Sequence, residues 1–154
     1  MKTRNIFLLV ILGAALPTGL IVLTVLAIAV PKFAASRMSA SEIAAVHEIR
    51  AIHAAQVQYV SMYGKYAATL AELGPPASGL ASPQAADLIS KSLASGEKDG
   101  YVFTLAATPK GYTINANPKI YNSTGHRTFY SDDTLAIHQN WSQEPANASS
   151  LELK

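Results

Sequence analysis

The chain of 154 residues contains no cysteine. It can therefore form neither a disulfide framework nor a thiolate metal site, and redox chemistry indicates no compartment for it. Charged residues are also scarce, at 14% of the sequence, and the net charge is only +2. The basic residues are scattered along the chain and form no patch of the kind that binds nucleic acid, so we expect no nucleic-acid partner.

Motifs that carry catalysis or bind cofactors are missing as well. The sequence has no Gly-x-Ser-x-Gly nucleophile elbow, no phosphate-binding loop, no dinucleotide fingerprint and no His-Glu-x-x-His zinc motif. Its four histidines are far apart in the sequence. We therefore expect no enzymatic activity and no cofactor.

Acidic residues are absent from the first part of the chain, where none occurs before Glu42. Lys2 and Arg4 precede an uncharged apolar run, Ile6–Val30, and a bilayer core requires about 20 apolar residues. The run therefore predicts a membrane anchor, which we place in residues 1–35. The basic amino end predicts an N-in, C-out topology. A removable signal peptide is the alternative, but its apolar core has only about 7–15 residues.

Three residues that disfavour a regular helix lie close together in the apolar run: Gly13, Pro17 and Gly19. Proline lacks a backbone donor and glycine lowers helix propensity, so we expect a kink or a melted turn there. In a bilayer, neighbouring helices, side chains or water must satisfy the carbonyl groups that such a break frees. We interpret these residues, together with Pro31, as positions of the assembled helix core. A kinked single span is the alternative.

Helical periodicity continues without a loop through Ser39–Tyr63, so the sequence predicts one long helix, Ile6–Tyr63. One face of its second half is large and apolar, which suits it to cover a protein core. The other face is rich in alanine and would allow other helices to approach closely, so we predict that Ala51 and Ala55 contact a neighbouring subunit. The predicted core face consists of Ala45, Val46, Ile49, Ile52, His53, Gln56, Val57, Tyr59, Val60 and Tyr63.

Polar and aromatic side chains on this helix have two interpretations each. His53 and Gln56 lie within the apolar face and could belong to a ligand site, although hydrogen bonding to a neighbouring loop at the edge of the core is the commoner role of such groups. Tyr59, Tyr63 and Tyr66 surround the end of the helix. Their spacing is typical of a core beneath a loop, and a stacked aromatic path is the alternative.

The rest of the chain predicts an α+β fold in which a four-stranded antiparallel sheet packs on the apolar helix face. Gly64 ends the long helix, and the segment that follows is loop-like with one helical turn within Ala67–Leu73. A globular domain, residues 36–140, precedes a flexible polar tail, residues 141–154, that is rich in Ser, Glu, Asn and Pro. The predicted elements are a helix at Ser82–Leu93, a polar turn at Ala94–Gly100, and strands at Tyr101–Ala106, Tyr112–Ala116, Arg127–Tyr130 and Thr134–His138.

Two adjacent carboxylates, Asp132 and Asp133, fall between the last two predicted strands. They are the only candidate metal ligands, because a turn with two carboxylates could supply oxygens to Ca²⁺. A Ca²⁺ site requires about 6–8 oxygens, however, so an ordinary β-turn is the favoured interpretation.

Several segments of the chain resemble the type IV pilins and the pseudopilins of type II secretion. They are Ala27–Phe33, Arg37–Glu42, Ile49–Tyr59 and Tyr63–Tyr66. The resemblance implies a subunit whose apolar helix lies in the inner membrane before assembly and in the core of a helical filament afterwards. Its partners would be further copies of itself or other pilins, in a cell-surface filament or a periplasmic pseudopilus. An exported, membrane-anchored binding module that does not polymerise is the alternative.

The chain departs from the processing signature of that family, which is a glycine followed by an aromatic residue and, one turn later, a glutamate. Leu9 and Ala14 occupy the positions of the glycine and the glutamate. We therefore predict that the assembled protein keeps its amino end, with Met1 or Lys2 first.

Overall fold

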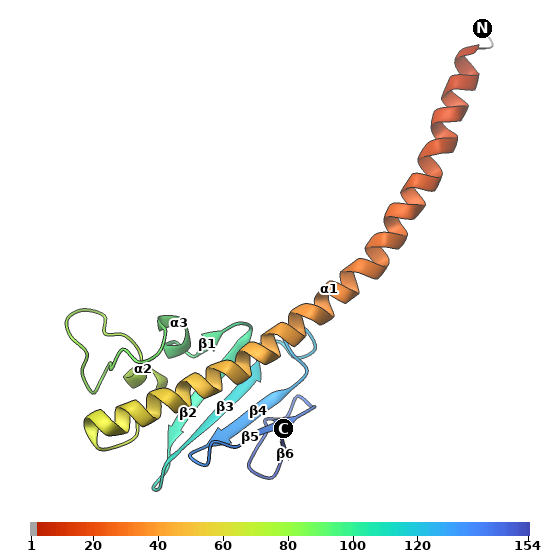
Figure 1. Cartoon of the computed structure of the whole chain (residues 1–154). Helices are drawn as coiled ribbons and strands as arrows, with labels where there is room; N and C mark the ends of the chain where they lie inside the picture. Colours follow the sequence, from red (N-terminus) through yellow and green to blue (C-terminus); the bar gives the residue numbers. More distant parts are fainter. Residues whose placement is uncertain (1–2) are drawn as a thin grey trace. The chain divides into compact units, whose positions relative to one another are not determined.

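The computed structural model describes residues 3–154, with side chains from Lys32 onward. Two compact units, Met1–Ser36 and Arg37–Lys154, make up the chain. The described residues form three helices and six strands (Figure 1). Their order is α1 (Thr3–Tyr63), α2 (Leu70–Leu73), α3 (Lys91–Ala94), β1 (Glu97–Lys98), β2 (Tyr101–Ala107), β3 (Tyr112–Pro118), β4 (Thr128–Asp132), β5 (Ile137–Asn140) and β6 (Leu151–Glu152).

The predicted membrane span, residues 6–30, falls outside the residues whose side chains the structure describes. The same holds for the predicted assembly positions Gly13, Pro17, Gly19 and Pro31. Among the described residues, no helix is both long enough and apolar enough to cross a membrane.

The second unit confirms the α+β class and the packing of a helix on an antiparallel sheet. The strands follow one another in chain order, β1-β2-β3-β4-β5-β6, and each pairs antiparallel with the next. The prediction of four strands is wrong, because β1 and β6 add one strand at each edge. Both have only two residues, which is too short for the alternation of apolar and polar residues that reveals a strand.

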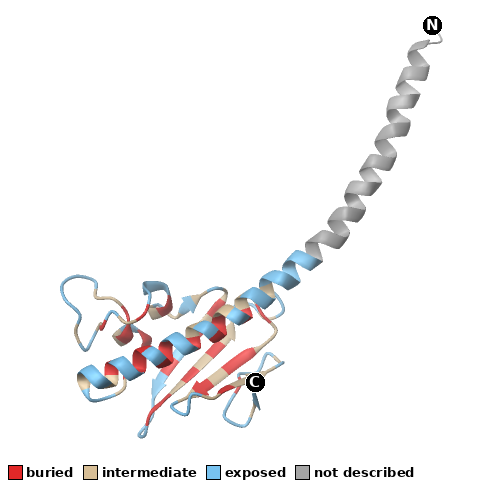
Figure 2. Ribbon diagram, viewed as in Figure 1, coloured by how far each residue is buried: buried red, intermediate tan, exposed pale blue. Residues whose placement is uncertain are grey.

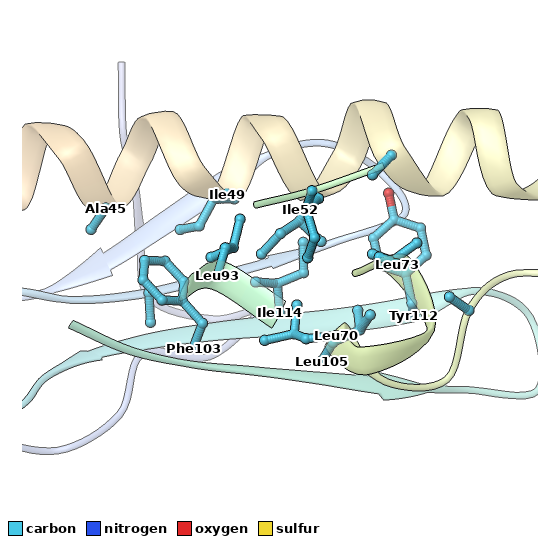
Figure 3. Close-up of a cluster of buried hydrophobic side chains, with 14 of the residues drawn as sticks. Ala45, Ile49, Ile52, Leu70, Leu73, Leu93, Phe103, Leu105, Tyr112 and Ile114 are labelled. Carbon is cyan, nitrogen blue, oxygen red and sulfur yellow. The ribbon is translucent and has the colours of Figure 1, made fainter. Parts of the chain in front are cut away.

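The core lies between α1 and the inner face of the sheet (Figure 2). Alternation along β2 and β3 turns the side chains at Phe103, Leu105 and Ile114 inward. They lie beneath Ile49 and Ile52 of α1 (Figure 3). Burying each such side chain contributes about 1.5–3 kcal/mol relative to leaving it exposed, so the sheet stabilises the second half of the helix.

α1 ends at Gly64, as the sequence predicts. The Gly64 amide donates to the Val60 carbonyl oxygen at 2.8 Å. The backbone of Gly64 has a φ of 71°, a left-handed conformation that costs glycine nothing.

The predicted helix at Ser82–Leu93 is wrong. Ser82 and Ala85 instead close a tight turn through mutual backbone hydrogen bonds of 3.0 Å. Asp87 follows with a φ of 57°, which no right-handed helix accommodates, and only α3 is helical. The amides of residues 86–89 donate to carbonyl oxygens of residues 72–74, so long-range hydrogen bonds replace those of the predicted helix.

The segment after Asn140, predicted to be a flexible tail, is bonded to the sheet. The Thr128 hydroxyl donates to the Glu144 carbonyl oxygen at 2.8 Å, and the Asn115 amide donates to the Ala146 carbonyl oxygen at 3.1 Å. Ala146 is buried, and β6 extends the sheet beside β5. Asparagine and threonine side chains on the outer face of the sheet therefore hold a segment whose own composition predicts disorder.

Candidate functional site

Five side chains on the domain-facing side of α1 make polar contacts with the rest of the second unit: Glu42, Glu48, His53, Gln56 and Tyr59. We call them the anchoring residues. They extend over more than four turns of the helix, because a turn has 3.6 residues. They therefore fix the last part of α1 to the domain in one orientation.

Glu42 is buried and its carboxylate is fully compensated. Its Oε2 accepts a hydrogen bond from Arg127 Nε at 2.8 Å, and its Oε1 accepts one from the His126 amide at 2.7 Å. The Arg127 Nη1 donates to Gln139 Oε1 at 2.8 Å. The guanidinium also lies over the Trp141 ring, 5.0 Å from its centroid. Charge-assisted hydrogen bonds and aromatic contacts thus replace the water that both charges lose.

Glu48 forms a second ion pair between helix and sheet, with Lys98 of β1. Glu42 and Glu48 are the acidic residues of the described part of α1, and both ion pairs direct their carboxylates toward the domain. The exposed side of that part of the helix carries cations, among them Arg37 and Arg50, and none of its exposed residues is acidic.

His53 is buried and uses both ring nitrogens. Its Nδ1 lies 2.7 Å from the Tyr112 hydroxyl, and its Nε2 lies 2.8 Å from Ser131 Oγ. The single hydroxyl proton of Ser131 is donated to the Ala136 carbonyl oxygen at 2.7 Å. Ser131 Oγ must therefore accept the proton of His53 Nε2, and His53 Nδ1 must accept the proton of Tyr112. This assigns a neutral imidazole with its hydrogen on Nε2.

Burial is the main cause of the perturbed pKa values in this network. It lowers the pKa of His53 below its ordinary value, an effect that the nearby Asp132 carboxylate partly opposes. It also raises the pKa of Tyr112 to about 12. Both side chains are therefore neutral near pH 7, as the direction of the hydrogen bonds requires.

A serine hydrogen-bonded to a histidine could suggest nucleophilic catalysis, but the geometry argues against it here. Ser131 is fully buried, and its proton is donated to a backbone carbonyl oxygen. A nucleophile must instead reach a substrate and give its proton to the base. The arrangement is a structural contact between α1, β3 and β4. His53 is thus a core group, although its partners are strand side chains and not the loop that the sequence suggests.

Gln56 does contact a loop. Its Nε2 donates to the Ala67 carbonyl oxygen and its Oε1 accepts from the Ala67 amide, both at 2.9 Å. The core interpretation of the tyrosines is also confirmed for Tyr59, which is fully buried and donates to the Pro83 carbonyl oxygen at 2.6 Å. The rings of Tyr59 and Tyr63 lie 4.7 Å apart between centroids.

Asp132 is the last residue of β4, and Asp133 begins the turn that joins β4 to β5. Asp132 Oδ1 accepts hydrogen bonds from the Thr134 amide at 3.0 Å and the Thr134 hydroxyl at 2.6 Å, and Oδ2 accepts one from Tyr130 at 3.2 Å. The bonds from Thr134 are the main reason why the pKa of Asp132 lies below its ordinary value. Within the described residues, no group of three or more acidic or histidine side chains could hold a metal ion.

The exposed side of α1 differs from the prediction at two positions. Ala55 has only 2% of its surface exposed, so its assignment to the assembly face is wrong. Ala55 lies next to Gln56, which is hydrogen-bonded to Ala67 in the loop after Gly64, and one turn before Tyr59, which is hydrogen-bonded to Pro83. Val57, predicted to lie in the core, is 58% exposed. Ala51 is exposed as predicted.

The exposed side chains of α1 from Ile43 onward define what we call its outer face. Ile43, Val57 and Met62 are large apolar residues on it, and alanines lie between them. The complete set is Ile43, His47, Arg50, Ala51, Ala54, Val57, Gln58, Ser61 and Met62. A helix face with this much apolar and small surface and so little charge is typical of a contact surface between helices.

Comparison of the chain with protein-family models, with curated proteins and with solved structures finds no match.

Proposed function

We propose that this protein is a structural subunit of a pilus-like filament, of the type IV pilin or pseudopilin kind, that polymerises through α1. The observation that carries the proposal is the combination of one continuous helix, Thr3–Tyr63, with the anchoring residues on one side and the outer face on the other. A helix needs about 20 residues to cross a bilayer, so α1 is three times longer than an anchor alone requires.

The anchoring residues support this role because they give each subunit a rigid link between helix and domain. A filament repeats one contact many times, so small variations in the orientation of the helix would accumulate along it. The ion pair of Glu42 with Arg127 and the hydrogen bonds of His53 fix that orientation at two places about three turns apart on the domain-facing side.

The outer face supports the role because it offers contact surface without acidic groups. Small side chains such as Ala51 and Ala54 let a second helix approach closely. A contact between two different surfaces of identical subunits builds an open helical polymer when its rotation does not close into a ring. The order of long helix, loop and antiparallel sheet is also the order that the resemblance to pilins implies.

In this proposal, residues 6–30 hold the subunit in the inner membrane before assembly, with the amino end in the cytoplasm. The assembled filament would lie at the cell surface or in the periplasm. Its partners would be further copies of the chain, alone or together with other pilins.

Electron microscopy of sheared cell-surface material, with an affinity tag at the carboxyl end, tests the proposal. Filaments that bind the antibody to the tag are the expected result. Replacing Ala51 by Trp should abolish them, because a large side chain prevents close approach at the outer face. Ala106, exposed on β2, provides the matched control, and its replacement by Trp should leave filaments intact. A tag confined to the membrane fraction would favour a membrane-anchored binding module instead.

A further inference from the structure

We propose that His53 is a pH-sensitive switch that holds α1 on the sheet while its ring is neutral and weakens this contact when the ring is protonated. The inference rests on the buried network around His53 and does not depend on polymerisation.

The network is a single chain of donated protons. Tyr112 of β3 donates to His53 Nδ1, His53 Nε2 donates to Ser131 of β4, and Ser131 donates to the Ala136 carbonyl oxygen. Each group has one proton to give and gives it in one direction. Only the neutral ring with its hydrogen on Nε2 satisfies all three bonds.

Protonation of the ring breaks this chain at one point. It places a hydrogen on Nδ1, which then becomes a donor and can no longer accept the proton of the Tyr112 hydroxyl, 2.7 Å away. Tyr112 must then turn its proton toward another acceptor, and none besides His53 receives it among the described residues. The imidazolium also brings a positive charge into a core position with 7% exposure. An unsatisfied buried donor and a buried charge both disfavour the packed state.

The groups that face the ring determine how far this effect is opposed. From β3 the facing group is Tyr112, and from the end of β4 the nearest charge is the Asp132 carboxylate, which favours the imidazolium. Asp133 lies next to it, and Tyr66 packs on the far side of Tyr112, with ring centroids 5.0 Å apart. On α1 itself the nearest charged residue is Arg50, which is exposed one turn away.

The balance of these groups sets the direction of the pH dependence. Desolvation exceeds the attraction of Asp132, and the pKa of folded His53 lies below 6.5, its value in the unfolded chain. The unfolded chain therefore binds more protons than the folded one below pH 6.5. The stabilisation is complete above pH 6.5 and is lost as the pH falls through the lowered pKa of His53.

The switch affects a part of α1 that contributes buried side chains to the core. His53 lies between Ile52 and Gln56 on the domain-facing side, and Ile49 is one turn earlier. Weakening the contact with β3 and β4 would loosen this part of the helix from the sheet first, because its neighbours at Glu42 and Tyr59 have separate partners.

Thermal unfolding of the full chain in detergent micelles between pH 7.5 and 4.5 tests the switch. The wild-type chain should lose stability as the pH falls below 6.5, with uptake of about one proton on unfolding. His53→Gln, which stays neutral, should remove this loss. The matched control is His47→Gln on the outer face, which should retain it. Equal losses in the wild type and in H53Q would overturn the proposal, as would a wild-type chain whose stability does not change between pH 7.5 and 4.5.

A second variant keeps the test decisive if H53Q does not fold. Tyr112→Phe retains the His53 ring but removes the donor to Nδ1, which raises the pKa of His53 in the folded chain toward 6.5, so the total loss of stability on acidification should be smaller than in the wild type. Proton NMR of the ring in the folded full chain gives the same answer directly. A His53 ring that titrates at or above pH 6.5 in the folded wild type, or a Y112F variant whose pH dependence is unchanged, would contradict the proposal.

Discussion

Glu42 of α1 and Arg127, which precedes β4, are 85 residues apart in the sequence and form a buried ion pair with an Nε–Oε2 distance of 2.8 Å. The pair joins the helix to the sheet at the end of the domain where the covered part of α1 begins. It also supports Trp141, whose ring packs against the guanidinium. Because both charges have lost most of their water, each one depends on the other.

Replacing Arg127 by Met should therefore destabilise the domain strongly, by about 3–5 kcal/mol, since it leaves the Glu42 carboxylate buried without its cation. Urea unfolding followed by the fluorescence of Trp141, the single tryptophan of the chain, would measure the loss. Lys119→Met is the matched control. Its ion pair with Glu97 has both side chains 54% exposed, so it should cost less than about 1 kcal/mol. Similar losses in the two variants would show that the Glu42 pair contributes no more than a surface pair.

Ala51 and Ala55 should respond in opposite ways to replacement by Trp. At Ala55 the new side chain must enter a packed core, so we expect the domain to lose about 1–3 kcal/mol or more. At Ala51 it extends into solvent, and the melting temperature of the domain should hardly change. Circular dichroism melts of both variants would measure this. A large loss for Ala51→Trp would mean that the outer face is covered by the domain itself.

A chain that begins at Phe33 should be soluble and fold cooperatively. The apolar side of α1 between Ala45 and Tyr63 is covered by its own sheet, and the second compact unit begins at Arg37. Circular dichroism and size-exclusion chromatography would show a monomer with a single melting transition. An aggregate, or a chain without a cooperative melt, would disprove the independence of this unit.

Tyr112 should ionise far above the ordinary tyrosine range. Burial raises its pKa to about 12, and burial likewise raises the pKa of Tyr101. Because the folded chain holds these protons more tightly than the unfolded one, the stabilisation is complete below pH 10 and is lost as the pH rises toward 12. Ultraviolet titration at alkaline pH should show a late ionisation that coincides with unfolding. Ionisation of all tyrosines near pH 10 in a chain that remains folded would contradict this.

Periodicity in the sequence predicts the elements that are long enough to show it. β2 and β3 each have seven residues, and their alternation places the inward side chains correctly. The burial of Glu42 could also have been predicted from helical periodicity. On a helix that turns 100° per residue, positions 42, 49 and 53 lie within about 20° of one line. A carboxylate in line with Ile49 and His53 predicts a buried partner for it.

Other features depend on contacts that no local pattern records. The fold of Ser82–Ile89 follows from hydrogen bonds to residues 72–74, and the attachment of the segment after Asn140 to the sheet follows from side chains of β3 and β4. Ala55 is buried where segments distant in the sequence contact its helix neighbours, Ala67 at Gln56 and Pro83 at Tyr59. The partners of His53 come from strands 59 and 78 residues away, so its role could not be separated from that of a ligand by sequence alone.

Photo-cross-linking from the outer face of α1 tests the central claim most directly. The natural chain has no cysteine, so Ala51→Cys provides a unique site for a benzophenone maleimide, and Ala106→Cys on β2 provides the control. In intact surface material, the probe at Ala51 should produce a ladder at multiples of the mass of the chain, whereas the probe at Ala106 should produce little of it. If the probe at Ala51 cross-links only to lipid, to unrelated proteins or to nothing, then the outer face is no contact between copies and the filament proposal is contradicted.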